Sequence, residues 1–360
     1  MSGAGGNRMT GVFRAAVPSL LALALGIFVA SLVMVAFGLN PVGVFSALFS
    51  GALLTQFGQS SVLNYMYAYV LLALAFLLPG KAGIWNVGGQ GQAILGGVSA
   101  AMVIEFIPLP PVLWILAAVV VAIVAGAAWS AVSGLLEAYR NASSIVTTIM
   151  MNFIAANLAT FVLYYILIPQ AHVPNYYTQI TFPAGATIPT LPYFTSSIMV
   201  GVAVLVAIGT AFFLSRTTLG YKIRATGLGS KPAESKGINP RSTKVISMVI
   251  GGGIAGLAGA GFVMSVGHGC GTVACYQDGF ASGWFGGIGF AGIAVALVAA
   301  NNPVASMFSA VFFAILAAGM PSAFQSLYVV WAMQGLIILF MAAPELSKRI
   351  LRVGGRTKWT

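Results

Sequence analysis

Hydrophobic residues fill most of the chain in long continuous runs, separated by short polar, charged or proline- and glycine-rich breaks. A helix needs about 20 apolar residues to cross the hydrocarbon core of a bilayer. The pattern therefore predicts an all-α polytopic membrane protein with about ten transmembrane helices. The predicted spans cover residues 15–38, 62–80, 88–106, 111–136, 145–167, 196–215, 244–266, 284–300, 304–319 and 327–343.

The composition agrees with a membrane protein. Of the 360 residues, 59% are apolar and 6% are charged, and the mean hydropathy is +0.98. Soluble domains carry about 25% charged residues, so a soluble enzyme, a disordered tail and a nucleic-acid binder are excluded. The first apolar run is too long for a signal-peptide core and is expected to remain as an uncleaved span. Two cysteines exclude a disulfide scaffold and a cysteine-based metal cluster, and we expect no metal site.

The basic residues fix the expected orientation. If the N-terminus is cytoplasmic, all 16 Lys and Arg residues fall on inside segments, as the positive-inside rule requires. Both termini are therefore predicted in the cytoplasm. The expected parts are a cytoplasmic N-terminal tail over 1–14, a transmembrane domain over 15–343 and a basic cytoplasmic C-terminal tail over 344–360. Within the membrane domain, 169–195 is an external loop and 216–244 is a cytoplasmic loop.

An internal symmetry follows from the span count. Five spans per half give the two halves opposite orientation, as in inverted-repeat transporters. The glycine-rich, tryptophan-bearing segments 83–92 and 283–290 open the third and eighth spans. We expect an inverted 5+5 repeat, although two ordinary glycine-rich membrane helices would explain the same match.

Candidate catalytic chemistry is absent from the sequence pattern. Residues 251–256 carry the letters of a dinucleotide-binding fingerprint, but they lie in an apolar span, where glycines four apart predict a helix-packing face. The sequence has no Gly-Lys-Ser/Thr phosphate loop, so we expect no cofactor on this chain. The five acidic residues fall at span ends or in loops. That placement argues against a proton relay and favours an external energy source or passive flow.

Neutral polar side chains are the groups available inside the membrane. Unpaired amides are costly in hydrocarbon, so they should face protein or a water-filled path. Stacking aromatic rings and neutral hydrogen bonds suit an uncharged polar solute such as a nucleoside or a sugar, although interhelical packing would explain each amide equally well. The predicted substrate pathway contains Trp85, Asn86, Gln90, Gln92, Thr148, Asn152 and Gln334.

The cytoplasmic loop has the features of a docking element. Ser230 can cap a short helix, Pro232 fits the first turn, and Gly237 can end it. This pattern predicts a two-turn helix across the inner face. A merely basic loop that obeys the topology rule is the alternative.

The stretches 83–95, 142–155, 217–260 and 289–303 resemble the permease subunit of an ABC importer, from the branch that serves simple sugars and nucleosides within the branched-chain amino acid/ribose-type permease superfamily. The resemblance implies a second permease subunit, identical or related, around one pore. It also implies ATPase subunits that hold ATP and Mg²⁺, an extracytoplasmic substrate-binding protein, and a place in the lipid bilayer of the inner or plasma membrane. The segment 219–239 resembles the one that carries the coupling helix. ATPase contacts are therefore expected at Tyr221, Arg224, Ser230, Ala233, Glu234 and Gly237.

The chain departs from the family pattern at two places. The family usually has an acidic residue at the position of Gly89, and the segment 268–275 is not family-like. Cys270 and Cys275 in that segment are predicted on the oxidising outer face, where a tight turn would allow a disulfide. Two free thiols are the alternative.

The expected function is that of the transmembrane permease subunit of an ATP-driven importer for a nucleoside or a simple sugar. A stand-alone carrier or channel for a neutral solute, without an ATPase partner, is the alternative. A membrane-embedded enzyme has no nucleophile, base or metal cluster to support it.

Overall fold

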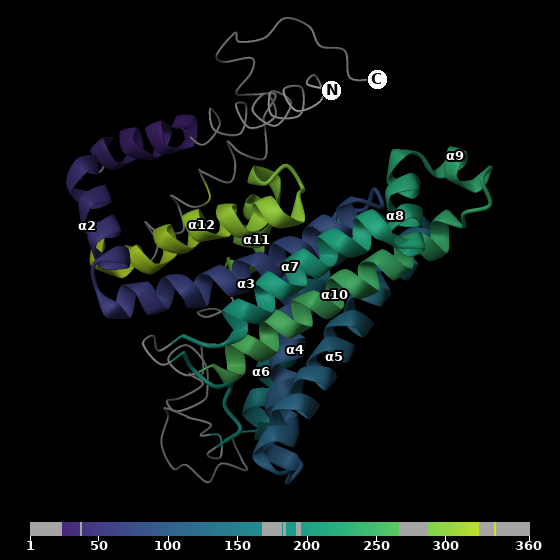
Figure 1. Ribbon diagram of the computed structural model, residues 1–360, viewed down its shortest axis with the longest axis horizontal. Helices are drawn as coiled ribbons and strands as arrows, with labels where there is room; N and C mark the ends of the chain where they lie inside the picture. Colours follow the sequence, from purple (N-terminus) through teal and green to yellow (C-terminus); the bar gives the residue numbers. More distant parts are fainter. Residues whose placement is uncertain are drawn as a thin grey trace, which may run out of the picture.

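The computed structural model describes residues 24–36, 38–167, 182, 185–191, 196–265, 287–323 and 335. Within these residues the chain is helical, and the only β contacts are two isolated bridges, Ile188 with Ser265 and Thr190 with Ser197. The prediction of an all-α protein is therefore confirmed for the described part of the chain (Figure 1). The predicted tails over 1–14 and 344–360 lie outside the described residues.

A helix over Ala24–Ala36 precedes the labelled elements. The labelled helices are α2 (Pro41–Leu53), α3 (Gln56–Gly80), α4 (Gly89–Phe106), α5 (Pro111–Arg140), α6 (Ser144–Val162), the π-helical turn η1 (Leu163–Leu167), α7 (Met199–Arg216), α8 (Thr218–Leu228), α9 (Ser230–Glu234), α10 (Pro240–Met264), α11 (Ile288–Val298) and α12 (Pro303–Ala323).

Five helices are long and apolar enough to cross a membrane: α3, α5, α6 continued by η1, α7 and α10. They confirm the predicted spans 62–80, 111–136, 145–167, 196–215 and 244–266 as apolar helices. The bent pair formed by Ala24–Ala36 and α2 is a sixth candidate. The predicted span 327–343 lies almost wholly outside the described residues.

The hydropathy pattern does not predict α2. After the described part of the first predicted span, Ala24–Ala36, the chain bends by 116° and forms α2 outside every predicted span. Asn40 starts α2 by accepting a hydrogen bond from the Val42 N–H at 3.1 Å.

The helix within the eighth predicted span, 284–300, is shorter than the span predicted. Its helix, α11, has 11 residues, which is about 16 Å and half a bilayer core. It ends because Ala300 and Asn301 both take left-handed backbone angles, with φ of 49° and 54°.

The bundle has an inner and an outer set of helices. In the apolar stretches of α3 and α10, 83% and 67% of the residues are buried, whereas the values for α5, α6 and α7 are 17%, 22% and 28%. The outer helices therefore leave most of their apolar side chains uncovered by the rest of the described chain, as a lipid-facing surface requires. In Figure 1, α3 runs beside both α7 and α10, and α8 and α9 extend beyond one end of the bundle.

Glycines bring the inner helices into backbone contact. Gly256 of α10 lies against both neighbours: a Cβ on Gly96 of α4 would be 2.6 Å from the Gly256 Cα, and a Cβ on Gly126 of α5 would be 2.8 Å from it. Real Cβ atoms do not approach so closely, so only glycine permits this crossing. The predicted helix-packing role of the glycines in α10 is confirmed by these contacts.

Replacing Gly256 with alanine should destabilise the bundle. The new methyl group would collide with the Ala122 carbonyl oxygen of α5, so we expect the free energy of unfolding in detergent to fall by about 1–3 kcal/mol. Gly209 of α7, which has open space where a Cβ would lie, is the matched control. Gly209→Ala should be neutral or stabilising by up to about 1 kcal/mol. Equal losses in both variants would contradict the proposed crossing.

Candidate functional site

The connection between α3 and α4 is the first part of the candidate site. It covers residues 81–88 and leaves regular helix geometry at one end of the bundle, where Asn86 and Gly88 are buried and Gly83 and Trp85 are exposed. Gly83 takes a left-handed φ of 81°, and the Ile84 N–H donates back to the Pro79 carbonyl at 3.1 Å. Buried non-helical backbone in a membrane protein requires polar partners within the protein.

Two buried amides supply those partners. Asn86 and Gln92 form a reciprocal pair, in which Asn86 Nδ2 donates to Gln92 Oε1 at 3.0 Å and Gln92 Nε2 donates to Asn86 Oδ1 at 2.9 Å. Asn86 also donates to the Ala75 carbonyl of α3 at 3.0 Å and accepts from the Gly88 N–H at 3.1 Å. Both side chains are almost fully buried. The pair therefore ties α3, the connection and α4 together.

Asn152 adds α6 to the same network. Its Oδ1 accepts from the Gly91 N–H of α4 at 2.8 Å, and its Nδ2 donates to the Val87 carbonyl at 3.0 Å. Thr148, one turn earlier on α6, donates to the Ser144 carbonyl at 2.6 Å and packs beside Gly88. The predicted pathway residues Asn86, Gln92 and Asn152 are thus brought together by hydrogen bonds. We name these three side chains the amide lock, because each of them pairs with groups of the chain itself.

Trp85 and Gln90 differ from the amide lock. Trp85 is half exposed, meets the Phe76 ring edge to face at 5.7 Å, and lines a shallow hollow with Ser143 and Ser144. The Gln90 side-chain oxygen is buried and has no hydrogen-bond partner among the described residues.

Gln90 also sits where the two glycine-rich segments meet. A Cβ on Gly289 of α11 would lie 2.5 Å from the Cβ of Gln90. The remaining predicted pathway residue, Gln334, lies outside the described residues, as do Cys270 and Cys275.

The predicted cytoplasmic loop over 216–244 contains a helix, α8, that the hydropathy pattern does not predict. Helix α8 begins at Thr218 and is capped by Thr217, whose hydroxyl oxygen accepts from the Gly220 N–H at 3.0 Å. At its other end, Gly227 packs on the α3–α4 connection so closely that a Cβ there would collide with the Lys81 carbonyl oxygen. The predicted contact residues Tyr221 and Arg224 are exposed on α8.

Helix α9 corrects the expected docking helix. It covers five residues, Ser230–Glu234, instead of two turns, and its N-cap is Gly229 and not Ser230. Gly237 ends this segment as predicted, with a φ of 78° and a bond from its N–H to the Glu234 carbonyl at 2.9 Å. Ala233 is 3% exposed, so a large side chain there would first disturb the chain's own packing.

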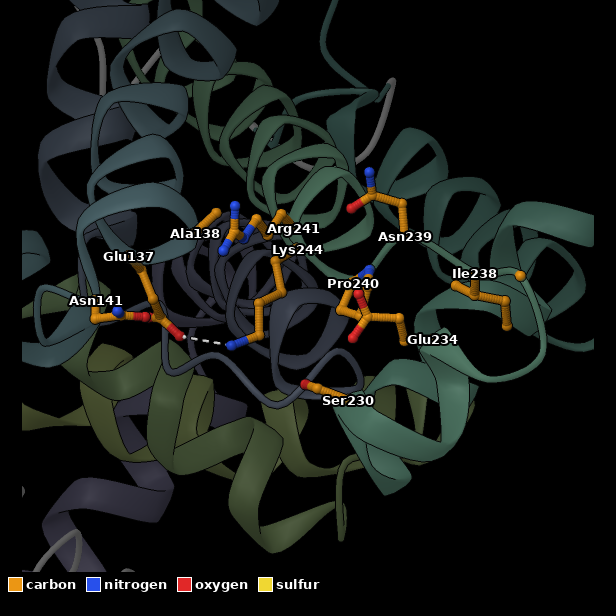
Figure 2. A pocket seen from close by; sticks show the side chains of 11 residues that line it. Glu137, Ala138, Asn141, Ser230, Glu234, Ile238, Asn239, Pro240, Arg241 and Lys244 are labelled. Carbon is orange, nitrogen blue, oxygen red and sulfur yellow. Dashed lines mark hydrogen bonds and ion pairs between the residues drawn. The ribbon is translucent and has the colours of Figure 1, made fainter.

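A pocket of about 610 Å³ lies between α9, the end of α5 and the start of α10 (Figure 2). Lys244 of α10 reaches Glu137 of α5 across it, with Nζ 3.3 Å from Oε1, while Glu234 lies on the opposite wall. The second carboxylate oxygen of Glu137 is buried without a hydrogen-bond partner in the described residues. This ion pair is not predictable from the sequence pattern, because its members are 107 positions apart.

The described residues therefore define a multi-pass membrane protein whose one end carries a short, exposed helical segment. The sequence pattern of the family described as "Branched-chain amino acid transport system / permease component" matches residues 58–342. The chain belongs to this family.

Three relatives agree with the family assignment. The chain is 32% identical to a nucleoside ABC transporter permease protein of Lactococcus lactis, over 84% of this chain and 83% of the relative. It is 29% identical to a glucose ABC transporter permease protein of Haloferax volcanii, over 93% and 88% of the two chains. It is also 29% identical to a guanosine ABC transporter permease protein of Bacillus subtilis, over 81% of each chain. No solved structure matches the chain significantly.

The chain is thus the permease component of an ABC importer in the cell membrane, and ATP is hydrolysed by a separate ATPase. Permeases of this family work with that ATPase and with a substrate-binding protein. The predicted resemblance to the simple-sugar and nucleoside branch is confirmed.

Removing one member of the amide lock should destabilise the protein. Asn152→Leu leaves the buried Gly91 N–H and Val87 carbonyl unpaired, so we expect the free energy of unfolding to fall by about 1–3 kcal/mol. Asn157, on the same helix, is exposed and bonds only to the Phe153 carbonyl of its own turn. Asn157→Leu should change the stability by less than about 0.5 kcal/mol. Unfolding in detergent measures both, and a stable Asn152→Leu protein would contradict the lock.

Proposed function

We propose that this permease imports an uncharged polar solute, a nucleoside first and a simple sugar second. The observation that carries the proposal is the neutral polar interior. The described acidic residues, Glu105, Glu137 and Glu234, lie near helix ends or in the cytoplasmic segment, whereas the buried polar side chains of α3, α4 and α6 are amides and hydroxyls. A charged solute would need a counter-charge along its path. The names of two relatives add support for a nucleoside.

Gln90 is our proposed contact for the solute. Its side-chain oxygen is an acceptor without a donor in the described residues, and it lies where the starts of α4 and α11 meet. An unpaired buried acceptor gains a full hydrogen bond when a hydroxyl or amine of a solute reaches it. The amide lock and Thr148 then hold α4 in place, and the path itself includes Gln90, Trp85 and Gln334.

The proposed assembly contains a second permease subunit, identical or related, on the other side of the pore. The proposed topology has ten spans, an inverted 5+5 repeat and both termini in the cytoplasm. The one-sided distribution of the 16 basic residues supports this orientation. The meeting of α4 with α11 supports the repeat, because each helix begins within one of the two glycine-rich segments.

The proposed ATPase contact is the exposed surface of α8 and α9. Two contacts would connect it with the interior: Gly227 of α8 rests on the α3–α4 connection, and Lys244 joins α10 to α5 beside α9. A displacement of α8 by the ATPase would therefore reach the amide lock through packed backbone.

A bulky side chain on α9 should uncouple transport. Lys231 is exposed, so Lys231→Trp leaves the chain's own packing intact but would separate α9 from the ATPase surface. We expect ATP-driven uptake in proteoliposomes to fall about tenfold, from lost surface complementarity. Arg140→Trp, which also removes one positive charge at an exposed cytoplasmic position, should keep most of the uptake. Equal uptake by both variants would reject α9 as the docking element.

The solute class can be tested by competition. Membrane vesicles that contain the permease, its ATPase and its binding protein should take up radiolabelled guanosine or uridine. Unlabelled nucleosides should compete, glucose should compete weakly, and a nucleoside monophosphate should not compete, because its buried charge would lack a partner. Gln90→Leu should raise KM by about tenfold. Competition by the monophosphate, or by glucose alone, would contradict the nucleoside proposal.

A further inference from the structure

A second cytoplasmic pocket lies on the other side of the coupling segment, where α7 passes into α8. It measures about 670 Å³. We name it the α7–α8 pocket, and it is lined by Ser215, Arg216, Thr217, Thr218, Tyr221, Lys222, Arg224, Lys236, Gly237 and Ile238. Four of these side chains are cationic and none is acidic.

The charge in this pocket is not neutralised within the described chain. The pocket beside α9 differs, because two acidic and two basic side chains line it and Lys244 pairs with Glu137. Lys81 lies close enough to Arg224 of this pocket for the two positive charges to repel each other. Its pKa is lowered by burial and by the nearby Arg224 guanidinium. A general inside-positive bias explains basic residues on this face but not their convergence on one concave, acid-free site.

The start of α8 adds donors to the pocket. Thr217 and Thr218 line it, and the helix itself can pair neither the Thr218 nor the Leu219 N–H. The Thr217 hydroxyl caps the next N–H, that of Gly220. The positive N-terminal end of α8 and four cationic side chains together suit a phosphate group.

The depth of the pocket indicates the source of that phosphate. Helix α7 is a membrane-spanning candidate that ends at Arg216, so on the proposed topology the pocket lies at the level of the inner-leaflet headgroups. Phe212, one turn before Arg216, is 64% exposed, and Leu219 and Tyr221 are also exposed beside the pocket. Apolar and aromatic side chains next to a basic pocket suit a lipid with acyl chains and a charged headgroup.

We propose that the α7–α8 pocket binds the phosphate headgroup of an anionic phospholipid of the inner leaflet, with the acyl chains along α7. The lipid neutralises Arg216, Lys222 and Lys236 and fixes α8 at the membrane surface. The ATPase-contact segment is thereby anchored to the bilayer at its α7 end and to the α3–α4 connection at its Gly227 end.

Native mass spectrometry of the permease purified with its ATPase tests the proposal. Phosphatidylglycerol is added to the delipidated complex, and its apparent Kd is compared with that of phosphatidylcholine. Arg216→Gln/Lys222→Gln should weaken phosphatidylglycerol binding about tenfold. Arg140→Gln/Arg241→Gln removes the same charge from exposed positions outside the pocket and should leave that binding unchanged. Thermal unfolding of both variants checks that each remains folded.

Three results would overturn the proposal. Equal losses in both double variants would mean that the lipid responds only to net charge. Equally tight binding of soluble glycerol phosphate would make the site one for a free phosphate. Loss of the ATPase from the pocket variant, with phosphatidylglycerol binding unchanged, would make the pocket a protein-docking surface.

Discussion

The pairing of buried backbone groups is the constraint on which this structure depends. In lipid, a helix satisfies its own N–H and C=O groups, but a chain that leaves helix geometry must find partners in the protein. The α3–α4 connection does so at one end of the bundle, where the amide lock of Asn86, Gln92 and Asn152 pairs its buried backbone groups. The non-helical α3–α4 connection determines where α4 begins and which side chains lie at its start.

Close backbone packing extends this constraint from the middle of the bundle to one end. Gly256 lets α10 touch α4 and α5 in the middle of the bundle, and Gly227 lets α8 touch the connection at the proposed cytoplasmic end. The contacts join the proposed ATPase surface to the proposed solute contact at Gln90 through helices and short turns. Such an arrangement transmits displacement because packed interiors deform little.

The sequence predicted the helical class and the five long described spans, because hydropathy reports the apolar length that a bilayer requires. It also placed Asn86, Gln92 and Asn152 inside the membrane domain. It could not distinguish a pathway from a lock, since an amide's role depends on partners 61 positions away, such as Gly91 for Asn152. Hydropathy also did not predict the short α11 or the bend before α2. Left-handed residues end α11 and an asparagine cap starts α2, and neither feature changes the apolar pattern.

Hydrogen–deuterium exchange of the permease in lipid nanodiscs tests the central claim most directly. If the amide lock pairs the connection's backbone, the Gly88 and Gly91 N–H groups, which donate to Asn86 and Asn152, should exchange as slowly as the core of α10. The exposed α9 should exchange much faster. Rapid exchange at Gly88 and Gly91, like that of a solvated loop, would contradict the account.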